Sequence, residues 1–311
     1  VVWRGTYVNK TKAKEAENIT DLSYSHVKYI KNKIKNKKIL DDIRIAKAFC
    51  YANSCYGAES YIGGFSGYAI ELLVYYYKGF LGFLKAMAKI KKDAKVIIDI
   101  EKHYKNKSQV MMDINTAKLA SPIILIDPTY KQRNALAALS EETFEKFKKE
   151  ASSFIKSPNL MDFEPKKKDL EKIKKEAEKK GYGFILLEAN TDKQAGDIAG
   201  SKLLKFYKHL AEEISKSFQI KNMGFNYNKD KSARYFFVTK SKGEIISEGP
   251  KLSDEKNLMR FSKKHKDVFT RENKIFARDK VKSSIKDFLD AWKSKNSQRI
   301  KEMGIIRLEV V

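Results

Sequence analysis

Residues 63–77, GGFSGYAIELLVYYY, constrain the fold more than any other part of the chain. Three glycines within five residues allow backbone angles or close approaches that a Cβ would forbid. The segment then repeats apolar residues at the spacing of one helical face, at Tyr68, Leu72, Tyr75 and Tyr76. Glu71 is its only charged residue, and an unpaired carboxylate in an apolar helix is costly to bury. The segment therefore predicts a buried helix behind a tight glycine turn, with the Glu71 carboxylate bonded to one specific group.

The length and composition are those of a folded protein with two or three domains. The chain has 311 residues, of which 42% are hydrophobic and 33% charged, a balance typical of soluble globular proteins. Its longest apolar run, residues 61–77, contains a charge and three glycines, so we expect no membrane span. No signal peptide is visible, and Cys50 and Cys55 are interpreted as small buried thiols. Because two cysteines exclude a disulfide framework, a reducing, cytoplasmic setting is expected.

The charge of the chain is strongly positive. Lys and Arg number 64 against 39 Asp and Glu, which gives a net charge of +25. The excess recurs along the chain, in residues 31–38, 166–180, 229–242 and 263–301. One interpretation is a set of solvated lysine faces, and the favoured one is a polyanionic partner, most simply nucleic acid. A distributed excess suits a long partner bound along its backbone better than a single phosphate pocket.

Motifs for catalysis are few. The chain has no G-x-x-x-x-G-K loop and no G-x-G-x-x-G, and its four histidines show no metal-ligand spacing. Asp99 and Glu101 are the only pair of carboxylates on a predicted strand, where alternation places both on one side, as two-metal phosphoryl transfer requires. A solvated strand end is the favoured interpretation of this pair. The residues alone therefore assign no catalytic chemistry.

The first half of the chain predicts a helical region with a small hairpin. Asp21 or Ser23 is expected to cap the first helix, and Ser140 a later one that ends near Ser157. Residues 95–100 and 122–127 are the clearest strands and are expected to pair as a hairpin. Asn134 is expected to cap a short helix after that hairpin.

The second half predicts a different architecture. After Ser157-Pro158-Asn159 the composition shifts to lysine and glutamate, and a helix of about 200–217 lies between strands in a β-α-β-β order. The fold class is therefore α+β. The expected division is a connection, a central helical domain, an α+β module and a C-terminal α+β region, over residues 1–20, 21–160, 161–250 and 251–311.

Several motifs, in order, resemble the archaeal (class I) CCA-adding enzymes. Gly64-Phe65-Ser66-Gly67-Tyr68 with Glu71-Leu72-Leu73 looks like the signature helix of that family. Further segments match in order and spacing: Tyr56-Gly57-Ala58-Glu59, Asp127-Pro128, Arg133-Asn134 and Ser157-Pro158-Asn159. The resemblance covers nearly the whole chain and is strongest over residues 20–165.

The resemblance implies a tRNA nucleotidyltransferase, which adds C, C and A to tRNA 3′ ends from CTP and ATP without a nucleic-acid template. It also implies a catalytic head whose carboxylates bind Mg²⁺, followed by domains that hold the acceptor and T arms of tRNA. Only the last strand of that head is expected here, and Val2 occupies the expected position of its third carboxylate. The chain starts at Val1, so we expect a fragment or one half of a split protein, with no catalytic residue and no metal site of its own.

The resemblance also implies nucleotide-binding residues outside the head. Ser23 and His26 match a hydroxyl and an imidazole that follow the last head strand, and Lys47 matches a triphosphate-binding lysine. Tyr56 matches a tyrosine beside the nucleotide, and Arg133 an arginine that helps to define the incoming base and its phosphates. A guanidinium can do both, because it presents five N–H donors in a planar fork.

Three functions are weighed. The favoured one is the tRNA-binding and nucleotide-positioning portion of a CCA tRNA nucleotidyltransferase, whose head is cut off or is a separate chain. The alternative is a stand-alone basic RNA-binding protein derived from such an enzyme, without catalysis. A poly(A)- or oligoadenylate-type transferase of the same superfamily is disfavoured by the glycine turn together with the Asp-Pro and Arg-Asn motifs. The resemblance also makes a homodimer an expected assembly.

Overall fold

The structure, a computed structural model, describes residues 22–91, 94–166, 168–281 and 283–311. The chain divides into two compact units, residues 1–166 and 167–311. The strand expected over residues 1–9, and Val2 within it, lie outside the described residues. The four-part division of the chain stays a prediction.

Helices dominate the first unit. They are α1 (Leu22–Lys33), α2 (Lys37–Ala52), α3 (Gly67–Tyr76), α4 (Phe80–Ala88), α5 (Lys107–Asp113) and α6 (Glu141–Lys156), with two 3₁₀ turns, η2 (Thr116–Leu119) and η3 (Leu160–Phe163). Ser140 caps α6 as expected, accepting from the Thr143 N–H. Ser23 lies inside α1 and does not cap it, because the helix begins one residue earlier.

The core of the first unit is aromatic and packs α2, α4 and α6 together. The Phe49 ring lies at its centre, 5.5 to 6.1 Å from the rings of four other phenylalanines: Phe80, Phe147, Phe154 and Phe163. Phe49 and Phe147 are completely buried, and each such side chain contributes roughly 1.5–3 kcal/mol by leaving water. The core thereby fixes α2 and α3 against the rest of the unit.

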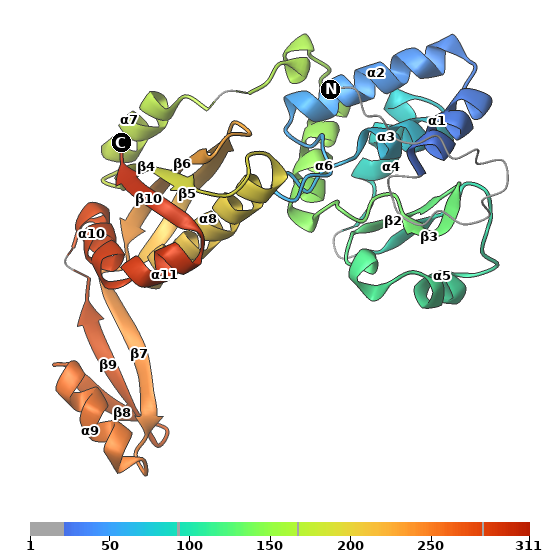
Figure 1. The fold of residues 1–311 in the computed structure, drawn as a ribbon. Helices are drawn as coiled ribbons and strands as arrows, with labels where there is room; N and C mark the ends of the chain where they lie inside the picture. The colour runs from blue at the N-terminus through green and yellow to red at the C-terminus, as the bar shows by residue number, and fades with distance from the viewer. Residues whose placement is uncertain (1–21, 92–93, 167, 282) are drawn as a thin grey trace. The chain divides into compact units, whose positions relative to one another are not determined.

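A three-stranded sheet completes the first unit, in the order β1 (Val96–Ile98), β2 (Ile123–Asp127), β3 (Tyr130–Asn134). The expected hairpin is wrong: β1 and β2 are parallel, and β2 and β3 form the antiparallel pair. Parallel strands need a long crossover, and the connection that carries α5 and η2 provides one. Every residue of β2 is buried, because the helical core covers one face of the sheet and α5 and η2 cover the other (Figure 1).

Asn134 does not cap a helix. It is the buried last residue of β3, and its Oδ1 accepts from the N–H groups of Leu125 and Leu136 at 2.9 Å each. The side chain therefore fastens the turn after β3 to β2.

The second unit contains a four-stranded antiparallel sheet in the order β10-β4-β6-β5. Its strands are β4 (Gly183–Thr191), β5 (Phe218–Tyr227), β6 (Ser232–Ser241) and β10 (Ile305–Val310). The helices α8 (Asp197–Ser217) and α10 (Ile285–Lys295) pack on one face and α7 (Leu170–Lys179) on the other, as Figure 1 shows. This is the expected β-α-β-β order with an added edge strand, which follows the short helix α11 (Ser297–Glu302).

A separate sheet of β7 (Glu244–Lys251), β9 (Lys274–Lys280) and β8 (Val268–Arg271) carries the helix α9 (Glu255–Lys264). The strands β8 and β10 were not anticipated from the sequence. The chain as a whole is a mixed α+β protein.

Candidate functional site

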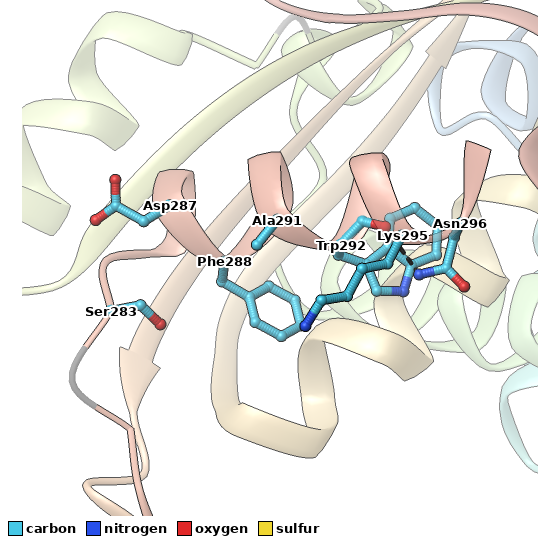
Figure 2. Close-up of a pocket in the computed structure, with 7 residues that line it drawn as sticks. All are labelled: Ser283, Asp287, Phe288, Ala291, Trp292, Lys295 and Asn296. Atoms are coloured by element: carbon cyan, nitrogen blue, oxygen red, sulfur yellow. Dashed lines mark hydrogen bonds between the residues drawn. The ribbon is translucent and has the colours of Figure 1, made fainter.

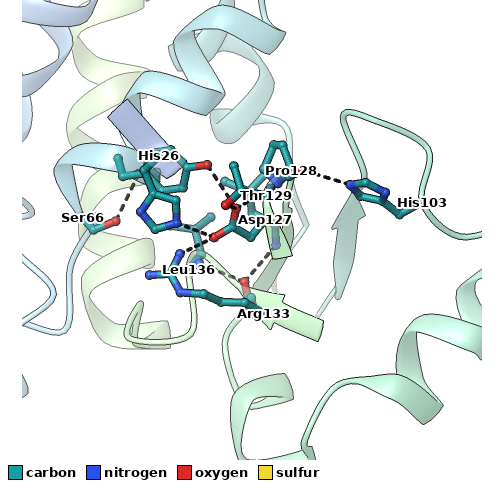
Figure 3. A network of polar contacts seen from close by, with 12 residues as sticks. His26, Ser66, His103, Asp127, Pro128, Thr129, Arg133 and Leu136 are labelled. Carbon is teal, nitrogen blue, oxygen red and sulfur yellow. Dashed lines mark hydrogen bonds and ion pairs between the residues drawn. The ribbon is translucent and has the colours of Figure 1, made fainter. Parts of the chain in front are cut away.

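The side chain of Asp127 is the centre of a polar network in the first unit (Figure 3). Its Oδ2 accepts from His26 Nε2 at 2.9 Å and from Arg133 Nη1 at 2.6 Å. Its Oδ1 accepts from the Tyr68 hydroxyl at 3.1 Å, and from the N–H and hydroxyl of Thr129 at 2.9 and 2.8 Å. One carboxylate therefore binds groups from α1, α3, the β2–β3 turn and β3.

The fold brings these groups together from distant parts of the sequence. Asp127 ends β2, and the antiparallel pairing of β2 with β3 returns Arg133 to its side. His26 comes from α1, 101 positions away, and its ring stacks on Tyr68 in the first turn of α3, with centroids 3.9 Å apart and an interplanar angle of 18°. The glycine turn before α3 thus sets the position of the Tyr68 ring, and that ring supports His26.

The surroundings of Asp127 keep it ionised. Burial raises its pKa, but the hydrogen bonds from His26, the Thr129 N–H and Arg133 outweigh burial and hold the pKa well below its usual range. The pKa of Tyr68 is raised, first by burial and then by the Asp127 charge. At neutral pH Tyr68 is therefore a neutral hydroxyl that donates to a carboxylate anion.

A second group of polar residues surrounds Gly67, next to Tyr68. Lys47 Nζ bonds Glu71 Oε1 at 2.6 Å, which confirms the prediction that the Glu71 carboxylate pairs with a specific donor. A Cβ on Gly67 would lie 3.0 Å from the Tyr56 hydroxyl and 3.8 Å from Lys47 Nζ. Lys47 is therefore paired with an acid, and Tyr56 lies against the start of α3.

The glycine turn holds Tyr56 in place. Tyr56 and Phe65 form an isolated parallel bridge, and the N–H of Phe65 donates to the Cys55 carbonyl at 2.8 Å. A Cβ on Gly64 would lie 2.3 Å from that Cys55 oxygen, so only glycine fits. Ser66 then caps α3 by accepting from the Ala69 N–H.

Four of the five expected nucleotide-binding residues are thus placed around the first turn of α3. His26 and Arg133 share Asp127, and Lys47 and Tyr56 lie beside Gly67. Ser23 is exposed on α1, three residues before His26 and so on the same side of the helix. The nucleotide-binding role of all five stays a prediction.

Sequence reasoning gave Asp127 no functional role and used it as the end of a strand and as part of the Asp127-Pro128 motif. The available signal was its place after Ile123-Ile124-Leu125-Ile126, since a carboxylate that ends a fully apolar run must find several donors.

Asp99 and Glu101 lie beyond the end of β1, and both bond to other parts of the first unit. Glu101 Oε1 accepts from the Tyr29 hydroxyl at 2.6 Å and pairs with Lys33 Nζ at 2.8 Å, which fastens α1. Asp99 Oδ2 accepts from the Tyr104 N–H at 2.9 Å. Among the residues that the structure describes, no group of three His, Cys, Asp or Glu side chains could hold a metal ion.

A shallow recess in the second unit lies along α10 and is lined by three apolar and four polar residues (Figure 2). Its volume is about 280 Å³, and its lining includes Phe288, Ala291 and Trp292, with Lys295 at one end. Known ligand pockets are usually larger, roughly 300–1,000 Å³. The recess is small, and none of the expected nucleotide-binding residues lines it, so the network around Asp127 is the better candidate site.

Comparison with known proteins identifies the class. Residues 41–164, which contain most of the Asp127 network, match the family model described as "tRNA nucleotidyltransferase, second domain". The chain is 33% identical over 259 residues to a CCA-adding enzyme of Nanoarchaeum equitans, an alignment covering 83% of this chain and 62% of that protein. It is 31% identical over 258 residues to a CCA-adding enzyme of Methanocaldococcus jannaschii, covering 81% of this chain and 56% of that protein.

Over the matched residues the chain is homologous to the tRNA nucleotidyltransferases. More narrowly, it is a homologue of the archaeal CCA-adding enzymes over their second domain and the sequence beyond it. The chain spans about 60% of the length of these relatives, 62% and 56% for the two compared above. No helix within the described residues has the length and apolar character needed to cross a membrane.

Proposed function

We propose that this chain is the tRNA-binding and nucleotide-positioning portion of a CCA tRNA nucleotidyltransferase, acting together with a catalytic head. The observation that carries the proposal is the shared Asp127 contact, which joins His26 of α1 to Arg133 of the region that matches the second domain of tRNA nucleotidyltransferases. Both residues also match nucleotide-binding positions that the resemblance to this family implies.

The charges and donors of the site suit a nucleoside triphosphate. Arg133 has five N–H donors and uses one of them on Asp127, so others can bind phosphate oxygens or a base edge. His26 and Ser23 lie one turn apart on α1, and Tyr56 borders the same turn of α3. These residues would hold CTP or ATP, and Mg²⁺ ions held by the head would neutralise developing charge on the triphosphate.

The rest of the chain supplies the polyanion-binding surface in this proposal. A net charge of +25 favours binding along an RNA backbone, and A-form stems such as the acceptor and T arms are recognised by shape rather than by sequence.

The nucleotide part of the proposal is tested by titrating the full chain with CTP, ATP and GTP in a calorimeter. CTP and ATP should bind and GTP should bind more weakly. Arg133→Lys keeps the charge but loses the planar fork, so it should weaken binding about tenfold. The matched control is Arg44→Lys, because Arg44 is an exposed arginine paired only with the neighbouring Asp41, and it should change affinity by less than about twofold.

The RNA part is tested with a tRNA that lacks its CCA end. The chain should bind it more tightly than a single-stranded RNA of equal length, with an affinity that falls linearly on a log–log plot against salt. Equal affinity for the two RNAs would contradict tRNA recognition.

The alternative of an RNA-binding protein without nucleotide binding has one observation in its favour. Lys47, the expected triphosphate-binding lysine, is already neutralised by Glu71. Selective binding of tRNA without any binding of CTP or ATP would support that alternative.

A further inference from the structure

We propose that Asp127 is a positioning residue of the nucleotide site, which fixes the imidazole of His26 and the guanidinium of Arg133 for contact with a triphosphate. The inference rests on the proposed function and adds to it a residue that touches no ligand itself. The Asp127 side chain is 0% exposed, whereas His26 is 13% and Arg133 24% exposed. The anion is therefore beneath the surface, and the two groups that it holds reach the surface.

The hydrogen bonds to Asp127 fix the orientation of the His26 imidazole and of the Arg133 guanidinium. The contact of His26 Nε2 with a carboxylate requires a proton on that nitrogen, so Nε2–H donates and Nδ1 is turned away from Asp127. Arg133 is held through Nη1 at 2.6 Å, which fixes the plane of the fork. Stacking on Tyr68, itself bonded to Asp127, fixes the imidazole plane as well.

The network differs from the Lys47–Glu71 pair in its ratio of donors to carboxylates. One Asp127 carboxylate holds two nitrogen donors, those of His26 and Arg133, whereas Lys47 and Glu71 form a one-to-one pair. The His26 and Arg133 side of α3 therefore presents more N–H donors per carboxylate to an anionic ligand.

Asp127→Asn tests the inference because it keeps the shape and exchanges one acceptor for a donor. The Thr129 N–H is a backbone donor that cannot rotate, so the amide oxygen should take the Oδ1 position. The amide NH₂ then faces His26 Nε2 and Arg133 Nη1, which are both donors in the wild type. Neutral His26 should consequently change tautomer, from a proton on Nε2 to a proton on Nδ1, and Arg133 should lose its acceptor.

Two measurements follow from this geometry. Nitrogen-15 NMR of the imidazole should show the Nε2–H tautomer in the wild-type chain and the Nδ1–H tautomer in Asp127→Asn. Calorimetric titration with CTP should show affinity weakened about tenfold or more, and the loss should be non-additive with Arg133→Ala because both changes remove the same positioned group.

The matched control is Glu101→Gln. Glu101 also fastens α1, through Tyr29 and Lys33, so its amide variant loosens the same helix without touching the Asp127 network. CTP affinity should stay within about twofold of the wild type, and the His26 tautomer should not change. An equal loss of CTP affinity in Asp127→Asn and Glu101→Gln would show that Asp127 only holds α1 in place, and would overturn the inference.

The outcomes separate this inference from the proposed function. Binding of CTP by the wild type with unchanged binding by Asp127→Asn overturns the positioning role alone, whereas no binding of CTP or ATP by the wild type overturns both. If Asp127→Asn does not unfold cooperatively, the variant is not properly folded, and the inference is then tested on the wild-type chain alone. In the wild type, His26 should keep its proton on Nε2, and the nitrogen-15 chemical shift of Nδ1 should change when CTP binds. An Nδ1–H tautomer in the free wild-type chain would overturn the inference.

Discussion

The ionisation of Asp127 couples the candidate site to the stability of the first unit. An unfolded carboxyl titrates near pH 4, whereas the hydrogen bonds from His26, Thr129 and Arg133 lower the folded pKa of Asp127 below that value. The folded state therefore binds fewer protons than the unfolded state between the two values. The stabilisation is complete above about pH 4 and is lost as the pH falls toward the folded pKa.

We predict that the first unit loses stability steeply below about pH 4 and that Asp127→Asn makes this loss shallower. The variant should have a lower unfolding free energy than the wild type at pH 7. This difference should narrow on acidification, because the wild-type carboxylate becomes protonated and loses its stabilising charge, whereas the amide does not titrate. Denaturant unfolding followed by circular dichroism at pH values from about 2 to 7 checks this. A difference in unfolding free energy that is constant across the range would contradict the lowered pKa.

The turn before α3 shows how one element places side chains from several others. Gly64 allows the backbone to lie against the Cys55 carbonyl, and the resulting bridge between Tyr56 and Phe65 leads the chain into α3 at Gly67. Phe65 is fully buried among the core phenylalanines, with its ring centroid 4.8 Å from that of Phe147. Packing of this one ring therefore fixes the entry into the helix that carries Tyr68 and Glu71.

Gly64→Ala should destabilise the first unit by about 1–3 kcal/mol, because its Cβ would meet backbone atoms that cannot move without breaking the bridge. Gly67→Ala is the control from the same turn. The three atoms nearest to its Cβ would be at the far ends of the Tyr56 and Lys47 side chains, so the stability of this variant should stay within about 1 kcal/mol of the wild type. Thermal or denaturant unfolding measures both, and equal stability of Gly64→Ala and the wild type would contradict the close approach.

The chain as a whole consists of two units with separate cores. The first core includes Cys50 and Cys55, and the second includes Trp292. Burial raises the pKa of both thiols, that of Cys55 to about 11, so neither should react with a thiol reagent while the first unit is folded. The two units therefore contain independent reporters of their own unfolding.

We predict that the two units unfold in separate transitions. In a Trp3→Phe background Trp292 is the only tryptophan, so its fluorescence follows the second unit while thiol labelling follows the first. Asp127→Asn should shift the thiol transition to lower denaturant and leave the tryptophan transition in place. Coincident transitions that shift together in this variant would show that the chain unfolds as one cooperative body.

Features that depend on neighbouring residues could be read from the sequence. The helix predicted over about residues 200–217 is α8, and the cap predicted at Ser140 was correct. These features depend on interactions over a few positions, which the local sequence contains in full. The need of Glu71 for a donor was predictable in the same way, since burial beside apolar residues is a local property.

Tertiary structure alone decided which distant groups meet. Apolar strands such as β1 and β2 carry no sign of their direction of pairing, and the long connection between them made a parallel pair where a hairpin was expected. The partners of Asp127 and Lys47 lie as far as 101 and 24 positions away, so their contacts exist only after the aromatic core has closed the intervening chain. Contacts between such distant positions depend on the folding of the whole intervening chain. The sequence therefore suggested His26 and Arg133 separately, and only the folded chain shows that Asp127 joins them.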